Sequence, residues 1–196
     1  MKRPILSLCA LVLLAANVCL SCASTGNNSA IAHYTQEIRL KPNDPEAYVY
    51  RGYEYYKKRD YDRAIADYTR ALQITPNDAI VYFVRGTAYH DKGDYDRAIA
   101  DYTQTIRLDP SYADAYIERG NAYADKGDFV RAIADITQAI RLEPNKADAY
   151  MSRGYKYAVK GDFDRAIADW ETVLRIEPAN ANARREIARA RQQRGY

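Results

Sequence analysis

The 196-residue sequence has few of the residues from which catalytic and metal-binding sites are built. Its only two histidines are His33 and His90, which belong to different repeated units, and its three cysteines all precede residue 23. It has no glycine-rich phosphate loop and no metal-ligand spacing. We therefore expect a non-enzymatic protein with no catalytic residue, no metal site and no cofactor.

A large charge excess is also missing. The formal net charge is +3, which gives no strong reason to expect nucleic acid as a partner. The sequence carries no signal of oligomeric state.

Long apolar runs are absent except near the N-terminus. Lys2 and Arg3 precede an apolar run over residues 5–16, and the small-residue segment NVCLSCAST follows it. This is the layout of a secretory signal peptide, and the run is too short to indicate a membrane-spanning helix. We predict that residues 1–22 are a signal peptide and that the protein is exported.

Two processing routes remain open for this segment. An ordinary signal peptidase could cut after Ala23, because Ser21, Cys22 and Ala23 are small. The segment CLSC at 19–22 resembles the bacterial lipobox, although Leu20 stands one place later than usual. In that case Cys22 would carry a lipid that anchors the chain to a membrane of the bacterial envelope, and otherwise the protein would be periplasmic. Residues 23–29 read as a polar tether.

The rest of the chain is dominated by one segment that is written four times. KRDYDRAIADY begins at residue 58, and close copies begin at residues 92, 126 and 160. Four glycines recur at the same constant spacing, namely Gly52, Gly86, Gly120 and Gly154. A fixed period of this kind indicates a stack of small units and not one wrapped core.

Each unit contains the signals of two helices. Asp44 followed by Pro45 is a typical helix start, and Tyr48, Gly52 and Tyr55 keep the spacing of one helix face. The KGD segments then predict a turn with a left-handed glycine, and a proline such as the one at 76 ends the second helix. Arg59 replaces glycine in the first turn, so we expect another geometry or strain there.

The recurring pattern of Tyr, Arg-Gly, Tyr, Ala, a large apolar residue (aromatic in three copies, Ile136 in the third) and Pro resembles the tetratricopeptide repeat over residues 45–180. The resemblance implies an all-α solenoid of antiparallel helix pairs, wound as a right-handed superhelix of about ten helices. We assign complete repeats to 45–78, 79–112, 113–146 and 147–180. Residues 30–44 read as a half repeat, and 181–196 as a basic capping helix, with contact to anionic lipid or cell-wall polymer as the alternative.

Arginine stands before each repeated glycine, where the family usually has leucine, and an aspartate follows at a constant distance in the second half of each repeat. Both residues are missing where the other half of the repeat is missing, because His33 takes the aspartate position and Ile187 the arginine position. We therefore predict structural pairs within each repeat: Arg51–Asp67, Arg85–Asp101, Arg119–Asp135 and Arg153–Asp169. An arginine ladder that binds anionic ligands is the alternative.

The resemblance also implies a function, since tetratricopeptide stacks bind segments of other proteins on a concave face lined by first helices. Family geometry directs three positions per repeat toward this groove, and they vary among the copies: Val49, Tyr53, Tyr56; Phe83, Thr87, His90; Ile117, Asn121, Ala124; Met151, Tyr155 and Ala158. Such an aromatic, weakly apolar strip suits a peptide better than an anion. The alternative for Tyr53 and Tyr56 is that they are ordinary exposed helix residues.

Two functional interpretations follow. In the first, the chain is a protein–protein interaction scaffold or adaptor of the bacterial cell envelope that binds peptide segments of partner proteins in its groove. In the second, it is a structural assembly subunit of an envelope complex, contacted on its convex face or its ends. Neither interpretation includes a nucleic-acid partner.

Overall fold

The computed structural model describes residues 28–194, and within this range the protein consists of ten helices without a strand. The all-α prediction is confirmed. The helices are α2 (Asn28–Leu40), α3 (Pro45–Lys57), α4 (Tyr61–Ile74), α5 (Ala79–Asp91), α6 (Tyr95–Leu108), α7 (Ala113–Asp125), α8 (Phe129–Leu142), α9 (Ala147–Val159), α10 (Phe163–Ile176) and α11 (Ala181–Arg194). The predicted signal peptide, Cys22 and residues 23–27 of the tether lie outside the described residues.

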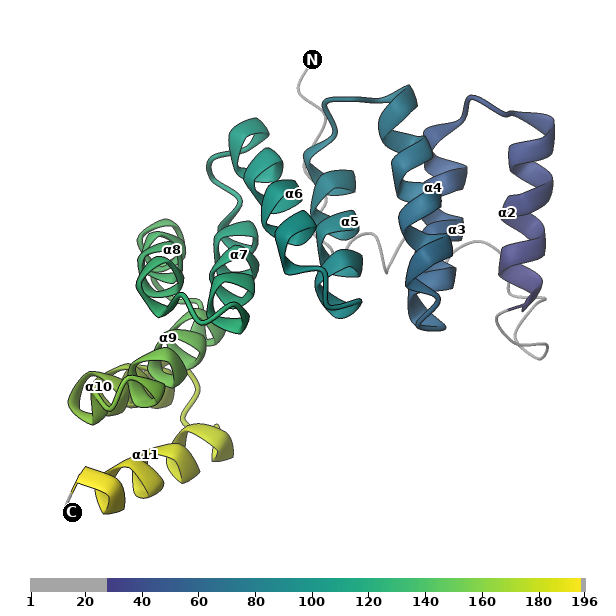
Figure 1. The fold of residues 1–196 in the computed structure, drawn as a ribbon. Coiled ribbons are helices and arrows are strands. Elements are labelled where there is room, and N and C mark those ends of the chain that lie inside the picture. Colours follow the sequence, from purple (N-terminus) through teal and green to yellow (C-terminus); the bar gives the residue numbers. More distant parts are fainter. Residues whose placement is uncertain (1–27, 195–196) are drawn as a thin grey trace.

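The helices follow one another in a curved row, with α2 at one end and α11 at the other (Figure 1). Each helix packs against the next one in the chain, as antiparallel neighbours joined by short turns must. First helices of adjacent repeats also meet, α5 with α7 and α7 with α9. In the bend, α7 lies on the inner side and α8 on the outer side (Figure 1).

The capping residues explain where the second helices begin. Asp60, Asp94, Asp128 and Asp162 each precede such a helix, and each side chain accepts a hydrogen bond from the backbone N–H three residues later. These bonds satisfy donors that a helix start leaves free. At the first repeat Asp44 caps α3 ahead of Pro45, where its side chain accepts from the backbone N–H of Glu46, two residues later.

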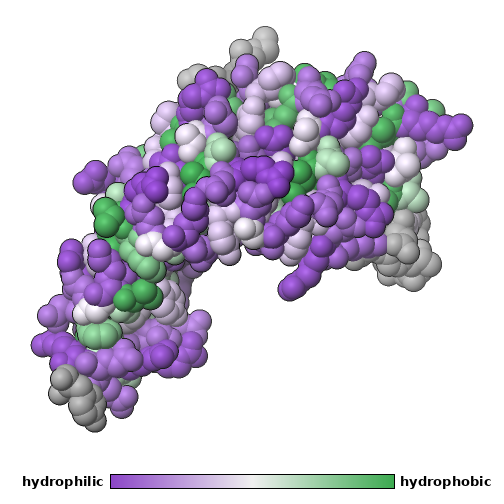
Figure 2. Space-filling view, viewed as in Figure 1, coloured by the Kyte–Doolittle hydropathy of each residue, from purple (hydrophilic) through white to green (hydrophobic). Residues whose placement is uncertain are grey.

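The apolar core is distributed along the stack. Buried apolar side chains form separate clusters around Tyr68, Tyr102, Ile136 and Trp170, each of which comes from a second helix. The view in Figure 2 shows mostly hydrophilic side chains on the surface, with smaller apolar areas between them. Each repeat therefore buries its apolar residues against its neighbours, as expected for a solenoid.

The repeated glycines allow the two helices of a repeat to approach closely. A Cβ atom on Gly52 would lie 2.8 Å from Cε1 of Tyr68, and one on Gly120 would lie 2.9 Å from Cγ1 of Ile136. Both distances are shorter than carbon atoms tolerate without a shift of the ring or the backbone. The large side chain of the second helix thus occupies the space that glycine leaves open.

The first turn resolves the question raised by Arg59. Its φ is 59°, close to the 86°, 83° and 77° of Gly93, Gly127 and Gly161. The turn keeps the geometry of the other copies, and the arginine carries the strain of a left-handed conformation.

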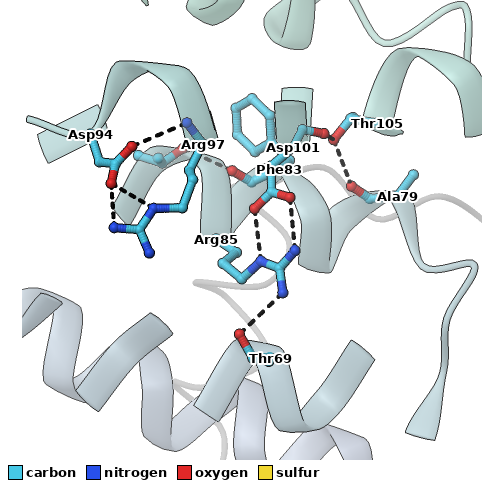
Figure 3. Close-up of polar contacts among 9 residues, drawn as sticks. Thr69, Ala79, Phe83, Arg85, Asp94, Arg97, Asp101 and Thr105 are labelled. Atoms are coloured by element: carbon cyan, nitrogen blue, oxygen red, sulfur yellow. Dashed lines mark hydrogen bonds and ion pairs between the residues drawn. The ribbon is translucent and has the colours of Figure 1, made fainter. Parts of the chain in front are cut away.

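The predicted arginine and aspartate side chains meet within each repeat. Arg85 donates from Nε and from a terminal nitrogen to the two carboxylate oxygens of Asp101, at 2.7 and 2.8 Å (Figure 3). Arg51, Arg119 and Arg153 bind Asp67, Asp135 and Asp169 in the same two-pronged way. About a sixth of each arginine side chain is exposed, 17–18%.

A threonine adds a second connection that the sequence analysis missed. The remaining terminal nitrogen of Arg85 donates to Oγ1 of Thr69 on the preceding repeat, at 3.1 Å (Figure 3). The same bond joins the other three arginines to Thr35, Thr103 and Thr137. Each arginine therefore links its own helix pair to the previous repeat, and these bonds leave little of the guanidinium to bind an anionic ligand.

Both ends depart from this arrangement. At the N-terminal end His33 lies 3.5 Å from Glu37 of its own helix. At the C-terminal end Glu171 stands at the threonine position and binds Arg191 of α11 at 3.0 Å. Arg194 pairs with Asp164 at 2.6 Å. The buried Ala183, Ile187 and Ala190 pack α11 against the last complete repeat, and its basic residues add exposed ion pairs at the rim.

The strained first turn leads to a stability prediction. We expect Arg59→Gly to increase the free energy of unfolding by about 0.5–1 kcal/mol, because relief of left-handed strain outweighs the greater flexibility of glycine in the unfolded chain. Urea denaturation of both proteins measures this change. Gly127→Ala is the matched control, since a Cβ there meets no atom within 4 Å, and it should lower stability through the backbone alone. An unchanged or lower stability of Arg59→Gly would contradict the prediction.

The arginine–aspartate pairs lead to a second prediction. Arg119→Ala and Asp135→Ala should each lower the free energy of unfolding by about 2–4 kcal/mol, because either change leaves a half-buried charge without its partner. The double variant should lose clearly less than the sum of the two. A double-mutant cycle by urea denaturation measures the coupling, and strict additivity would refute it. Thr103→Val removes the bond from Arg119, together with the bond that the Thr103 hydroxyl donates to the Ile99 carbonyl within α6, and should lower stability by about 1 kcal/mol.

Candidate functional site

Hydrogen bonds between side chains join the first helices into one surface. The Tyr56 hydroxyl of α3 donates to Asp91 of α5 at 2.5 Å. His90 of α5 lies 2.7 Å from Asp125 of α7 through Nε2. Both contacts join residues that are 35 positions apart, one more than the length of a repeat. Equivalent faces of successive first helices therefore lie side by side. We call this surface the inner face.

The centre of the inner face is a polar cluster. The side-chain oxygen Oδ1 of Asn121 accepts from Nζ of Lys156 at 2.7 Å and from Oγ of Ser152 at 2.8 Å. Its amide nitrogen donates to Glu118 at 3.3 Å. Asn121 therefore connects an acidic and a basic side chain that come from different repeats.

Burial acts against both charges of this cluster. It raises the pKa of Glu118, and a smaller contribution from Asp114 acts in the same direction. It also lowers the pKa of Lys156, although Asp125 and Glu118 favour the charged form. Neither residue forms a direct ion pair within the described part of the chain. Half-buried, perturbed charges of this kind are found more often at functional sites than elsewhere.

Aromatic side chains flank the polar cluster. Toward the N-terminal side, the Lys57 ammonium lies 5.1 Å above the ring of Tyr53, and burial together with the bond to Asp91 raises the pKa of Tyr56. Toward the C-terminal side, the half-exposed Tyr155 makes an edge contact with Trp170, with ring centres 5.5 Å apart. The inner face thus combines exposed ring edges with a polar centre, which suits an amphipathic ligand.

The structure separates the twelve predicted groove positions into two sets. Phe83 and Ile117 are buried in the core, with 7% and 6% of their surface exposed, so their assignment to the groove is wrong. The reason is that both pack against neighbouring helices, Phe83 for example against Tyr102 and Tyr112. Val49 and Met151 are half-buried and contact core clusters, as do Tyr56 and Ala158. The half-buried or exposed residues, which form the accessible set, are Val49, Tyr53, Tyr56, Thr87, His90, Asn121, Ala124, Met151, Tyr155 and Ala158.

The predicted groove positions left out the charged residues and one serine of the inner face. Asp91, Glu118, Asp125, Ser152 and Lys156 lie two, six or nine places after the first aromatic residue of their repeats. Positions one, five and eight alone describe too narrow a stripe, since a helix face also includes their immediate neighbours. A wider stripe would have identified Glu118 as the only acidic residue in a column that otherwise holds Tyr50, Val84 and Ser152.

Residues 28–194 contain no group of three or more histidine, cysteine or acidic side chains placed to hold a metal ion. None of the helices described here combines the length and the apolar character that crossing a membrane requires.

Comparisons with known proteins agree with the geometry. A family model described as TPR repeat matches residues 52–93 and 86–127, and one described as Tetratricopeptide repeat matches 117–181. No curated protein matches the sequence.

Several solved structures share the fold. A crystal structure of MamA is 27% identical, with a TM-score of 0.73, and the match covers 80% of this chain and 91% of that one. The first TPR of Spaghetti (RPAP3), bound to the HSP90 peptide SRMEEVD, is 30% identical with a TM-score of 0.58, covering 60% of this chain and 94% of its own. MamA 41-end from Desulfovibrio magneticus RS-1 is 22% identical with a TM-score of 0.76, covering 87% and 96%, and shows the fold alone.

The matched family models together span most of the described residues, and the repeat frame, the paired helices and the solved structures agree with them. Proteins of this fold are generally non-enzymatic interaction modules. The chain therefore belongs to the tetratricopeptide repeat family and is a protein–protein interaction scaffold.

Proposed function

We propose that this protein is an adaptor of the bacterial cell envelope that binds peptide segments of partner proteins along its inner face. The observation that carries the proposal is the half-buried polar cluster of Glu118, Asn121 and Lys156 between two aromatic areas. The pKa shifts of Glu118 and Lys156 mean that burial disfavours both charges, so packing alone does not account for them. A bound peptide with complementary polar groups would compensate them.

The dimensions of the inner face also suit a peptide. The polar and aromatic residues come from four successive first helices, from Tyr53 on α3 to Tyr155 on α9. Such a row offers several separate anchors, which an extended or helical segment can reach and a small molecule cannot. The RPAP3 domain among the similar structures holds the peptide SRMEEVD. That ligand is a property of its own domain, and it supports only the class of partner proposed here.

The envelope location rests on the sequence of residues 1–23. Their charged start, apolar run and small-residue end are typical of an exported bacterial protein, which is either periplasmic or anchored through a lipid on Cys22. Incorporation of a labelled fatty acid that is lost in a Cys22→Ala variant would establish the anchor. Incorporation that persists in this variant would exclude it.

Glu118 gives a prediction that separates stability from binding. Because the pKa of Glu118 is raised in the folded protein, its ionised form destabilises the fold at neutral pH. We expect Glu118→Gln to increase the free energy of unfolding at pH 7. The difference should shrink as the pH falls through the folded pKa and vanish below the unfolded value of about 4.3. Urea denaturation across this pH range measures it, and a destabilised variant at pH 7 would contradict the prediction.

The binding proposal is tested by affinity capture from the source organism's envelope extract. We expect Tyr53→Ala/Tyr56→Ala and Glu118→Gln each to lose partners that the unchanged chain captures. Both variants alter the inner face and leave in place the residues that recur in every repeat. The matched control is Arg70→Ala/Gln73→Ala, which changes two exposed residues of the second helix α4. Melting curves must first show that every variant is folded.

The outcome decides between two roles. Partners lost from the inner-face variants but kept by the control support the adaptor. Partners retained by all variants would refute groove binding and would favour the assembly subunit, which is contacted on its outer face or its ends.

A further inference from the structure

Equivalent pockets recur along the edge of the stack where the two helices of each repeat are joined. Three of them have volumes of about 330, 400 and 570 Å³. Each is lined by a Lys-Gly-Asp turn, by the first residues of the following second helix, and by a basic residue of the next unit. The basic residues are Lys126, Lys160 and Arg194 in that order. We call the middle one the third-repeat pocket.

In the two outer pockets an ion pair crosses from one repeat to the next. Asp96 pairs with Lys126, and Asp164 pairs with Arg194 at 2.6 Å. The same contact joins Asp62 and Lys92 at 2.5 Å across the first turn. These pairs are exposed, so each contributes only about 0–1 kcal/mol to stability. Their effect is to neutralise the edge of the stack.

The third-repeat pocket departs from this pattern at one position. Val130 stands where the other repeats have Asp62, Asp96 and Asp164. Among residues 28–194, no carboxylate lies within ion-pair distance of Lys160 as a result. The charged side chains that line the pocket are three basic ones, Lys126, Arg131 and Lys160, and a single carboxylate, Asp128.

Exposed apolar surface accompanies the missing carboxylate. Val130 is 70% exposed, and Val159, the residue before Lys160, is 68% exposed. The two belong to α8 and α9, which lie in the C-terminal half of the stack, where Figure 2 shows apolar side chains at the surface. In the other repeats the position of Val130 is acidic, so this combination of an exposed aliphatic residue and a lysine without an ion-pair contact is specific to the third repeat.

The walls of the pocket are held in place by the scaffold. Asp128 caps α8 and binds Arg131 at 2.5 Å, while the Arg131 guanidinium lies 4.3 Å above the ring of Tyr123. Lys126 is held by Asp96 of the preceding repeat. Lys160 is the C-terminal cap residue of α9, directly before the left-handed Gly161. Binding here requires little ordering beyond the Lys160 side chain.

We propose that the third-repeat pocket binds an acidic–aliphatic segment of a partner protein. A carboxylate of the partner pairs with Lys160, in the role that an aspartate of the chain itself has in the other repeats. An adjacent aliphatic side chain covers Val130. Charge complementarity selects the acid, and a peptide offers both groups on neighbouring residues. This surface lies at the turns and not on the inner face, so the inference stands independently of groove binding.

Methyl NMR of the full chain tests the proposal with three capped tetrapeptides that contain Glu-Leu, Gln-Leu or Lys-Leu between glycines. We expect Glu-Leu to shift the methyl resonances of Val130 and of the neighbouring Val159 in a saturable way. Gln-Leu should bind about fivefold more weakly, the upper end of what one exposed ion pair contributes, and Lys-Leu more weakly still. Equal affinity for Glu-Leu and Gln-Leu, or no saturable shift with Glu-Leu, would overturn the proposal.

One single-residue variant should remove the site, and another should create a second one. Val130→Asp supplies the missing carboxylate and should abolish the response to Glu-Leu, which in this variant is read from the methyl resonances of Val159, 68% exposed beside Lys160. Asp96→Val creates the same combination in the second repeat and should add a second site of similar affinity. If Val130→Asp does not fold, Lys160→Gln should show the same loss. Undiminished binding by a folded Val130→Asp or Lys160→Gln protein would refute the assignment, whereas Tyr53→Ala/Tyr56→Ala should leave this response unchanged.

Discussion

Each repeat depends on the close approach of its two helices at a glycine. The missing Cβ of Gly52 or Gly120 makes room for Tyr68 or Ile136, and the arginine before the glycine then reaches the aspartate of the second helix. Close packing and the two-pronged ion pair therefore require each other, since the first brings the charged groups within reach and the second satisfies them in a partly dry place. A threonine of the preceding repeat accepts a hydrogen bond from the remaining terminal nitrogen of the arginine, and this bond fixes each repeat relative to the one before it.

This arrangement leaves other positions without a structural role. The residues that recur in every repeat do so because each copy packs its two helices together in the same way. The inner face and the turn edge carry residues that differ from copy to copy, such as Glu118, Lys156 and Val130. Such side chains are exposed or work against burial, and the fold would be as stable or more stable without some of them. Binding surfaces of repeat proteins are built from positions of this kind.

The fold and the candidate site differ in how far the sequence predicts them. The constant repeat period, the capping aspartates, the turn glycines and the loss of Arg and Asp at the two ends predict the helix pairs and the ion pairs within them. These features depend on local geometry and on contacts between neighbours in the chain. The groove prediction was poorer. Phe83 and Ile117 are buried in the core, and the charged residues beside the expected stripe were left out.

The sequence by itself determined the repeat, its register and the residues on which the packing depends, because each of these is repeated at a constant spacing. Only the tertiary structure decided which varying residues meet. The contacts of Tyr56 with Asp91, of His90 with Asp125 and of Asn121 with Lys156 depend on how one repeat is rotated against the next. That rotation is the sum of many side-chain contacts between repeats, and no short motif records it.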